Sequence, residues 1–247
     1  MIYETRGESD KAEQMLRKAL EIDEKLGRLE GMAIQYGNLG LIYRRRGELD
    51  KAEQMHRRAL EIDEKLGLLE GMAIQYGNLG LIYLRRGELD KAEQMHRRAM
   101  EIEERLGRLE GMASEYAALG LVYYERGDFR RAEEMHIKGL NIEEKLGRLE
   151  GMANQYGNLG LIYQGKGQLD EAEKMYLKVL KIEERLGRPE SVANAYGNLG
   201  AIYKERGDIK KAREYWVKGR DLFVRIGMPI EVKLVEGLIE GLDGAGS

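Results

Sequence analysis

The fold is decided by residues 36–43, Tyr-Gly-Asn-Leu-Gly-Leu-Ile-Tyr, because this stretch returns at a fixed interval along the chain. It recurs unchanged at 76–83 and 156–163, and with small changes at 116–123 and 196–203. Two series of glycines keep the same interval of forty residues: Gly7, Gly47, Gly87, Gly127, Gly167 and Gly207, and Gly27, Gly67, Gly107, Gly147, Gly187 and Gly227. Residues 28–67 and 68–107 differ only at Arg28/Leu68, Arg44/Leu84, Leu60/Met100, Asp63/Glu103 and Lys65/Arg105. One supersecondary unit has therefore been copied in tandem.

Each unit is predicted to contain two helices. In residues 29–46 the apolar positions Met32, Tyr36, Leu39 and Tyr43 advance by four, three and four residues, which places them on one helical face. The left-handed conformation that ends a helix suits glycine, so we expect this helix to end at Gly47. Neither helix alone can bury its apolar stripe, so neighbouring units are expected to stack into a continuous core.

A second helix is predicted to run to about Leu66 and to end at Gly67. We expect Asp50 to cap its N-terminus, with Glu53 three residues later completing a capping box. The predicted buried side of this helix carries Ala52, Met55, Ala59, Leu60 and Leu66.

The interval divides residues 1–241 into a single predicted solenoid. A truncated first unit occupies 1–27, full units occupy 28–67, 68–107, 108–147, 148–187 and 188–227, a capping helix covers 228–241, and 242–247 form a flexible tail. Met1-Ile2-Tyr3 aligns with Leu41-Ile42-Tyr43, so we expect the sequence to begin inside a helix of a longer array, with the partner helix at 10–26. Lys233 and Glu236 stand where Ala193 and Tyr196 stand one unit earlier, which gives the last helix the polar face that a solenoid end needs.

Composition restricts the class of protein. The 247 residues include 41 Lys+Arg against 44 Asp+Glu, a net charge of −3 that does not favour nucleic acid as partner. Cysteine is absent, which removes disulfides and thiol chemistry, and no apolar run approaches the ~20 residues of a membrane span. We therefore expect a soluble, cytoplasmic protein.

No pattern of residues predicts catalysis, a cofactor or a metal site. Successive units carry His56, His96 and His136 on helices that pack about 8–10 Å apart, too far to share an ion, so they are predicted to be partly buried packing residues. Acidic pairs such as Glu103-Glu104 are predicted to lie on solvated faces. Since no nucleophile is paired with a base, we expect no enzymatic activity.

The unit resembles the tetratricopeptide (TPR) pattern, in which a first aromatic is followed by Leu-Gly, a tyrosine and later alanines. Here those positions are Tyr36, Leu39-Gly40, Tyr43, Ala52 and Ala59, and the match recurs along nearly the whole chain. The usual phenylalanine is replaced by His56, His96, His136, Tyr176 and Trp216. Units of forty residues look like those of the LGN or Pins adaptors and the kinesin light chains. The resemblance implies an all-α, right-handed TPR superhelix (an α-solenoid) that binds extended peptides in a concave groove.

The resemblance also implies which side chains meet a ligand, because the first helix of each TPR pair lines the inner surface. The implied peptide-binding residues are Asn38, Asn78, Asn158, Asn198, Arg44, Arg45, Leu84, Arg85, Tyr124, Asn154 and Asn194. A carboxamide can pair with a backbone N–H and C=O together, so the recurring asparagines are predicted to hold a peptide main chain. The alternative is that they are hydrated or bond within their own helix.

Two further features of the same surface remain open to two interpretations each. Each asparagine is preceded by a glycine, which costs about 1 kcal/mol relative to alanine in a helix: Gly37, Gly77, Gly157 and Gly197. Either a ligand or a helix approaches closely at these positions, or the glycines were inherited when the sequence was duplicated. Arg44, Arg45 and Arg85 predict that the early units favour an acidic or amphipathic segment, or else they are solvated helix ends.

The function favoured by the sequence is a protein-interaction scaffold that binds an extended segment of a partner protein. The alternative is a self-assembling structural module that forms homo-oligomers through its terminal helices, because Met15, Leu16 and Ala19 are predicted to be exposed on the first one.

Overall fold

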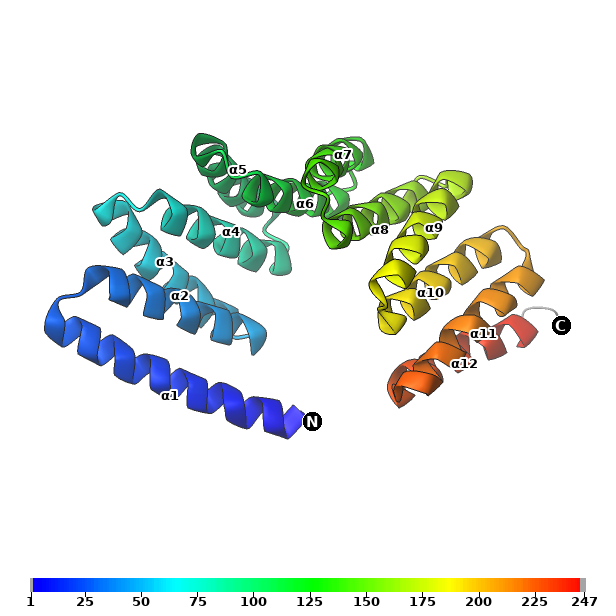
Figure 1. Cartoon of the computed structure of the whole chain (residues 1–247), viewed down its shortest axis with the longest axis horizontal. Helices are drawn as coiled ribbons and strands as arrows, with labels where there is room; N and C mark the ends of the chain where they lie inside the picture. Colours follow the sequence, from blue (N-terminus) through cyan, green and yellow to red (C-terminus); the bar gives the residue numbers. More distant parts are fainter. Residues whose placement is uncertain (1, 245–247) are drawn as a thin grey trace. The chain divides into compact units, whose positions relative to one another are not determined.

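The protein folds into helices throughout the part of the chain that its computed structural model describes, which is residues 2–244 for the backbone and 9–242 for side chains. The chain divides into two compact units, Met1–Arg126 and Gly127–Ser247 (Figure 1). Within each unit consecutive helices pack in antiparallel pairs joined by short turns. The predicted all-α solenoid of helix–turn–helix units is thereby confirmed.

Helices of two kinds alternate along each unit. The first unit contains α1 (Ile2–Leu26), α2 (Leu29–Arg45), α3 (Leu49–Leu66), α4 (Leu69–Arg85), α5 (Leu89–Leu106) and α6 (Leu109–Glu125). The second unit contains α7 (Phe129–Leu146), α8 (Leu149–Gly165), α9 (Leu169–Leu186), α10 (Pro189–Glu205), α11 (Ile209–Ile226) and α12 (Pro229–Gly244). The even-numbered helices, which begin the predicted units, are called A helices below, and the odd-numbered ones B helices.

From Gly27 onward, both series of glycines form the turns, as predicted. Gly47 ends the turn after α2 with φ of 77°, and Gly67 follows α3 with φ of 69°; the glycines from 27 to 227 in the two series all have positive φ. At this φ a side chain is strained, whereas glycine is not. Behind each turn the chain bonds back to the helix, as where Glu48 N donates to Tyr43 O at 2.9 Å.

The start of the chain departs from the prediction. Helix α1 runs without a break from Ile2 to Leu26, although a turn was expected at Gly7. Elsewhere the turn joins two helices that pack on each other, but only five residues of the corresponding A helix precede it in this sequence. Continuing the helix instead satisfies the backbone hydrogen bonds locally. At the other end α12 reaches Gly244, beyond the expected limit of 241, and the rest of the predicted tail lies outside the described residues.

The predicted N-cap at Asp50 is wrong. The cap position is two residues earlier, at Glu48, whose side chain makes no capping bond. Where that position is aspartate the cap forms: Asp128 accepts from Arg131 N at 3.0 Å and Asp208 from Lys211 N at 3.1 Å. Asp50 lies in the first turn and instead binds Arg86, just after the following A helix, so its role is between helix pairs.

The core follows the predicted stripes with one exception. Tyr36, Leu39 and Tyr43 are buried, and so are Ala52 and Ala59 of the B helix. Leu66 is 41% exposed, because it occupies the last turn of α3 where the chain leaves the packed interface.

A histidine fills the slot between two A helices. His56 of α3 is fully buried, and a Cβ added at Gly40 of α2 would lie 2.5 Å from its Nε2. On the other side His56 Nδ1 lies 2.9 Å from Oε1 of Gln75 in α4, and burial lowers the pKa of His56. His96 and His136 repeat this arrangement with Glu115 and Gln155. These histidines are packing residues, and more deeply buried than predicted.

The two glycines of one motif are therefore not equivalent, and Gly157 and Gly160 of α8 make the comparison within a single helix. A Cβ at Gly160 would lie 2.6 Å from Tyr176 Cε1, whereas one at Gly157 would meet nothing within 4 Å. We predict that Gly160→Ala lowers stability by about 1–3 kcal/mol through overpacking. Gly157→Ala should raise it by up to about 1 kcal/mol through helix propensity. Thermal unfolding followed by circular dichroism measures both, and equal effects of the two would contradict the assignment.

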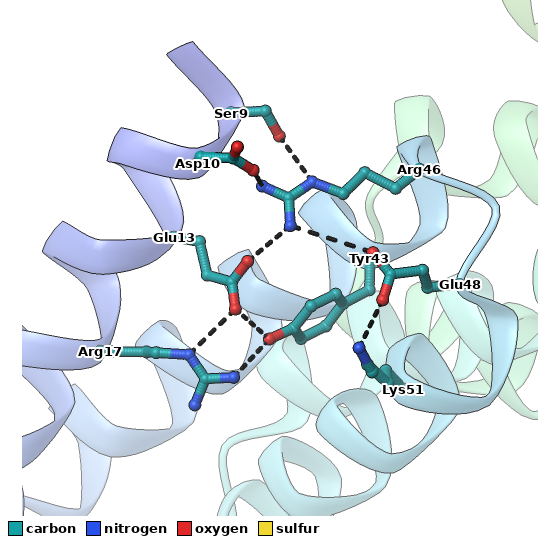
Figure 2. Close-up of polar contacts among 8 residues, drawn as sticks. All are labelled: Ser9, Asp10, Glu13, Arg17, Tyr43, Arg46, Glu48 and Lys51. Atoms are coloured by element: carbon teal, nitrogen blue, oxygen red, sulfur yellow. Dashed lines mark hydrogen bonds and ion pairs between the residues drawn. The ribbon is translucent and has the colours of Figure 1, made fainter. Parts of the chain in front are cut away.

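A polar cluster ties five of the six B helices, α1 to α9, to the A helix that follows, and Figure 2 shows the first copy. Glu13 of α1 accepts from the hydroxyl of Tyr43 in α2 at 2.5 Å and from Arg17 at 3.0 Å. Arg46, just after α2, binds the other oxygen of Glu13 and also Asp10, both at 2.5 Å (Figure 2). We call this group of carboxylate, tyrosine and arginine the inter-pair clamp.

The clamp recurs at the interval of the repeat. Its carboxylate–tyrosine pairs are Glu13–Tyr43, Glu53–Tyr83, Glu93–Tyr123, Glu133–Tyr163 and Glu173–Tyr203. The cation that closes it is Arg46, Arg86, Arg126, Lys166 and Arg206 in turn. Although burial opposes ionisation of Glu53, bonds from Tyr83 and Arg86 lower its pKa to about 2.

Removing one clamp carboxylate should destabilise the stack and weaken its response to acid. Because the pKa of Glu53 is lowered from 4.5 to about 2, its stabilising contribution is present above pH 4.5 and is lost as the pH falls toward 2. We predict that Glu53→Gln costs about 1–3 kcal/mol at pH 7. The difference between parent and variant should shrink over that pH range.

The control is Glu61→Gln, an exposed carboxylate on the same helix. Thermal unfolding at a series of pH values compares the three proteins. A parent-to-E53Q difference that stays constant from pH 5 to about pH 2 would contradict the role of the clamp.

Candidate functional site

The four recurring asparagines, which we call the asparagine ladder, occupy equivalent positions on the A helices of each unit. We call the face of the A helices that carries them the A-helix stripe. Asn38 and Asn198 are exposed, and Asn78 and Asn158 are half-buried. Asn78 Nδ2 donates to the carbonyl of Ile74 in its own helix at 3.0 Å, which is the alternative that the sequence left open. Side-chain hydrogen bonds are absent at Asn38, Asn158 and Asn198 within the described part of the chain. Three of the four carboxamides thus keep both donor and acceptor available.

The glycines beside these asparagines fall into two groups. At Gly37 an added Cβ would lie 3.3 Å from Gln75 Nε2, and at Gly77 it would lie 2.9 Å from Glu115 Oε1. Close packing by the next A helix therefore accounts for the glycines of the first unit. At Gly157 and Gly197 an added Cβ would meet nothing within 4 Å, so in the second unit the backbone is open to an approaching molecule.

Three arginines cluster at the C-terminal ends of α2 and α4. Arg85 Nη1 donates to the carbonyl of Arg44 at 3.1 Å, and the pKa of Arg44 is lowered by burial and by the charges of Arg85 and Arg45. In the described residues none of the three forms an ion pair, unlike the neighbouring Arg46 and Arg86, which close the clamp. The cluster is therefore an unneutralised positive surface.

The other predicted site residues lie on A helices of both units. Leu84 and Tyr124 are half-buried near the ends of α4 and α6. Asn154 and Asn194 of the second unit are exposed, four residues before Asn158 and Asn198 on the same helices. At the end of α10, Lys204 Nζ lies 5.9 Å from the ring centroid of Trp216, and Glu205 accepts from Gln164. Lys204 and Glu205 thus each have a side-chain partner, whereas Arg44, Arg45 and Arg85 form no ion pair in the described residues.

A cavity of about 760 Å³ opens between α10, α11 and α12, and sequence reasoning did not find it. Asn194, Gly197 and Asn198 line one side, and the rings of Trp216 and Phe223 lie at its base. Val235 and Leu238 of α12 complete it. The available signal in the sequence was the row of large aliphatic residues Ile230, Leu234 and Leu238 in α12.

The prediction that the acidic pairs lie on solvated faces is right for Glu104 but wrong for Glu103, the first member of its pair. Glu103 is only 5% exposed, and an added Cβ at Gly111 would lie 2.2 Å from its carboxyl group. Burial raises the pKa of Glu103, while the charge of Arg108 opposes that shift. Asp63 is packed in the same way against Gly71. A glycine eight residues after the acid was the available signal.

The described residues offer neither a metal site nor a membrane-spanning helix. There, no three His, Asp or Glu side chains come together as a metal ion would need. Nor is any helix in this range both long and apolar enough to cross a membrane.

With this geometry, comparison with known proteins identifies the class. The tetratricopeptide repeat family model matches residues 1–65, 72–145 and 151–221, and the chain belongs to that family. Tetratricopeptide repeat proteins are generally non-catalytic scaffolds that bind protein partners. Among curated proteins none matches the chain.

Solved structures share the fold at low sequence identity. BtubC (BKLC) from P. vanneervenii gives a TM-score of 0.78 at 24% identity, over 89% of this chain and 92% of that one. A putative kinesin light chain of nearly identical TPR-like repeats from Podosopora anserina gives 0.65 at 20% identity, over 77% and 94%. The apo form of RapI gives 0.73 at 17% identity, over 90% and 64%. The predicted resemblance to kinesin light chains is confirmed for the fold.

Proposed function

We propose that the protein is a non-enzymatic, cytoplasmic scaffold that binds an extended segment of a partner protein along its A-helix stripe, without a cofactor. The observation that carries this proposal is the row of exposed or half-buried asparagines whose carboxamides are not used by the fold at Asn38, Asn158 and Asn198. Each carboxamide can donate to and accept from a peptide main chain, which gives affinity without requiring a particular side chain. Each unit carries its own part of the ladder.

The test is selection from a phage-displayed library of random dodecapeptides, followed by affinity measurement with synthetic peptides. We predict that a double variant lowers the affinity for selected peptides by about tenfold, whether it is Asn38→Ala with Asn78→Ala or Asn158→Ala with Asn198→Ala. The reason is that each carboxamide supplies hydrogen bonds worth ~1 kcal/mol. Thermal unfolding confirms that the variants are folded. Peptides that bind both double variants as tightly as the parent would refute the ladder.

The arginine cluster of the first unit is proposed to select acidic segments. Charge reversal in Arg44→Glu with Arg85→Glu should weaken peptides bound to this unit by about tenfold at low salt and by less at high salt, because exposed charges are screened. The control Lys65→Glu with Arg105→Glu makes the same change in net charge at exposed positions on α3 and α5. If the two double variants bind the peptides with equal affinity at every salt concentration, the arginines do not select acidic segments.

Self-assembly is a second candidate because of α1. Met15, Ile22 and Leu26 are 72%, 55% and 56% exposed, as the prediction required at Met15, whereas Leu16 is half-buried against the core around Tyr43. An apolar face of this kind favours association of copies.

Light scattering over a range of protein concentrations separates the two functions. Self-assembly predicts a mass that rises with concentration and returns to that of the monomer in Met15→Ser with Ile22→Ser. A monomer at all concentrations would eliminate the second candidate.

A further inference from the structure

The last helix changes the chemistry of the A-helix stripe. Residues 230, 234 and 238 of α12 stand forty residues after Glu190, Asn194 and Asn198 of α10. All three are large aliphatic residues, and they remain exposed: Ile230 at 70%, Leu234 at 65% and Leu238 at 45%. Where the preceding helix offers a carboxylate and two amides, α12 therefore offers an apolar row spaced by four residues.

This row adjoins the cavity between α10, α11 and α12. Leu238 lines both, and Asn194 and Asn198 lie on the opposite side of the same cavity. The volume of about 760 Å³ is within the ~300–1,000 Å³ of ligand pockets. At its base Trp216 Nε1 already donates to the carbonyl of Gly197 at 3.0 Å, so the ring offers mainly an apolar surface.

The charges around the cavity indicate an uncharged occupant. Glu205 bonds to Gln164, and the Lys204 ammonium group lies over the Trp216 ring. They are the charged residues of the lining, and their opposite charges leave it with no net charge. The apolar side chains would gain from contact with apolar groups, at roughly 25 cal/mol per Å² buried.

The dimensions favour a peptide over a small molecule. From Ile230 to Leu238 the helix rises about 12 Å, so the apolar row continues well beyond the cavity mouth. An extended chain covers that length with about four residues, and its alternate side chains, about 7 Å apart, point to the same side. The carboxamides of Asn194 and Asn198 can meanwhile pair with its main chain.

We propose that α10, α11 and α12 form a subsite for an extended segment of a partner protein that carries two large apolar side chains separated by one residue. One apolar side chain enters the cavity beside Trp216, and the other lies against Leu234 and Ile230. The inference rests on the proposed function, and it adds a requirement in the ligand that the asparagine ladder does not make.

The experiment uses dodecapeptides selected on the whole chain, and for each a synthetic version with its large apolar residues changed to serine. Binding is compared between the parent and Leu234→Ser with Leu238→Ser, two exposed positions whose change leaves the core intact. The control is Val224→Ser, an apolar residue of α11 that is 58% exposed and does not line the cavity. Thermal unfolding of each variant verifies the fold.

We expect a recurring pair of large apolar residues in the selected peptides. Affinity should fall by about tenfold or more in the L234S/L238S variant and with the serine peptides, and should be unchanged in V224S. If N158A/N198A lowers the affinity for the selected peptides but L234S/L238S does not, the subsite is overturned and the asparagine ladder is retained. Peptides that are insensitive to both would overturn the proposed function as well.

Two other outcomes would also overturn the subsite. One is a selection that yields no peptide preferring the parent to L234S/L238S. The other is concentration-dependent dimerisation that disappears in L234S/L238S, because the occupant would then be a second copy of the chain.

Discussion

Packing of each B helix against the following A helix is the contact on which everything else depends. A hairpin of two helices cannot bury its stripe alone, so the chain is stable only as a stack. The inter-pair clamp fixes how neighbours meet, since Glu53 binds both Tyr83 and Arg86 of the next pair. The histidine slot acts at the same contact, with His56 pressed against Gly40 and bonded to Gln75. Apolar burial favours stacking, while these directional bonds define its geometry.

The same contact determines which residues remain for a ligand. Buried groups of the A helices, such as Tyr43 and Gly40, are committed to their own or the preceding B helix. Asn38, Asn158 and Asn198 form no side-chain hydrogen bond within the described residues, so these positions can vary with little effect on the stack. That freedom accounts for differences along the array: arginines that form no ion pair in the first unit, amides on α8 and α10, and an apolar row on α12.

Sequence alone predicted the helices, the glycine turns and most of the core, because a strict period of forty repeats each signal several times. It failed where a position serves the contact between pairs instead of its own helix. Asp50 looks like a cap locally but binds Arg86, thirty-six residues away. Glu103 looks solvated but packs against Gly111. The cavity beside Trp216 was missed for the same reason, since it is formed by three helices together. How far each asparagine is exposed could be determined only from the packed structure.

The central claim is that the asparagine side chains of the A-helix stripe contact a bound peptide. The most direct measurement is a nitrogen–proton NMR spectrum of the side-chain amide groups, recorded while a selected peptide is added to the labelled protein. The account predicts that the signals of Asn38 and Asn78, or of Asn158 and Asn198, shift in proportion to binding. Shifts confined to B-helix amides such as Gln54, with the stripe asparagines unmoved, would contradict it.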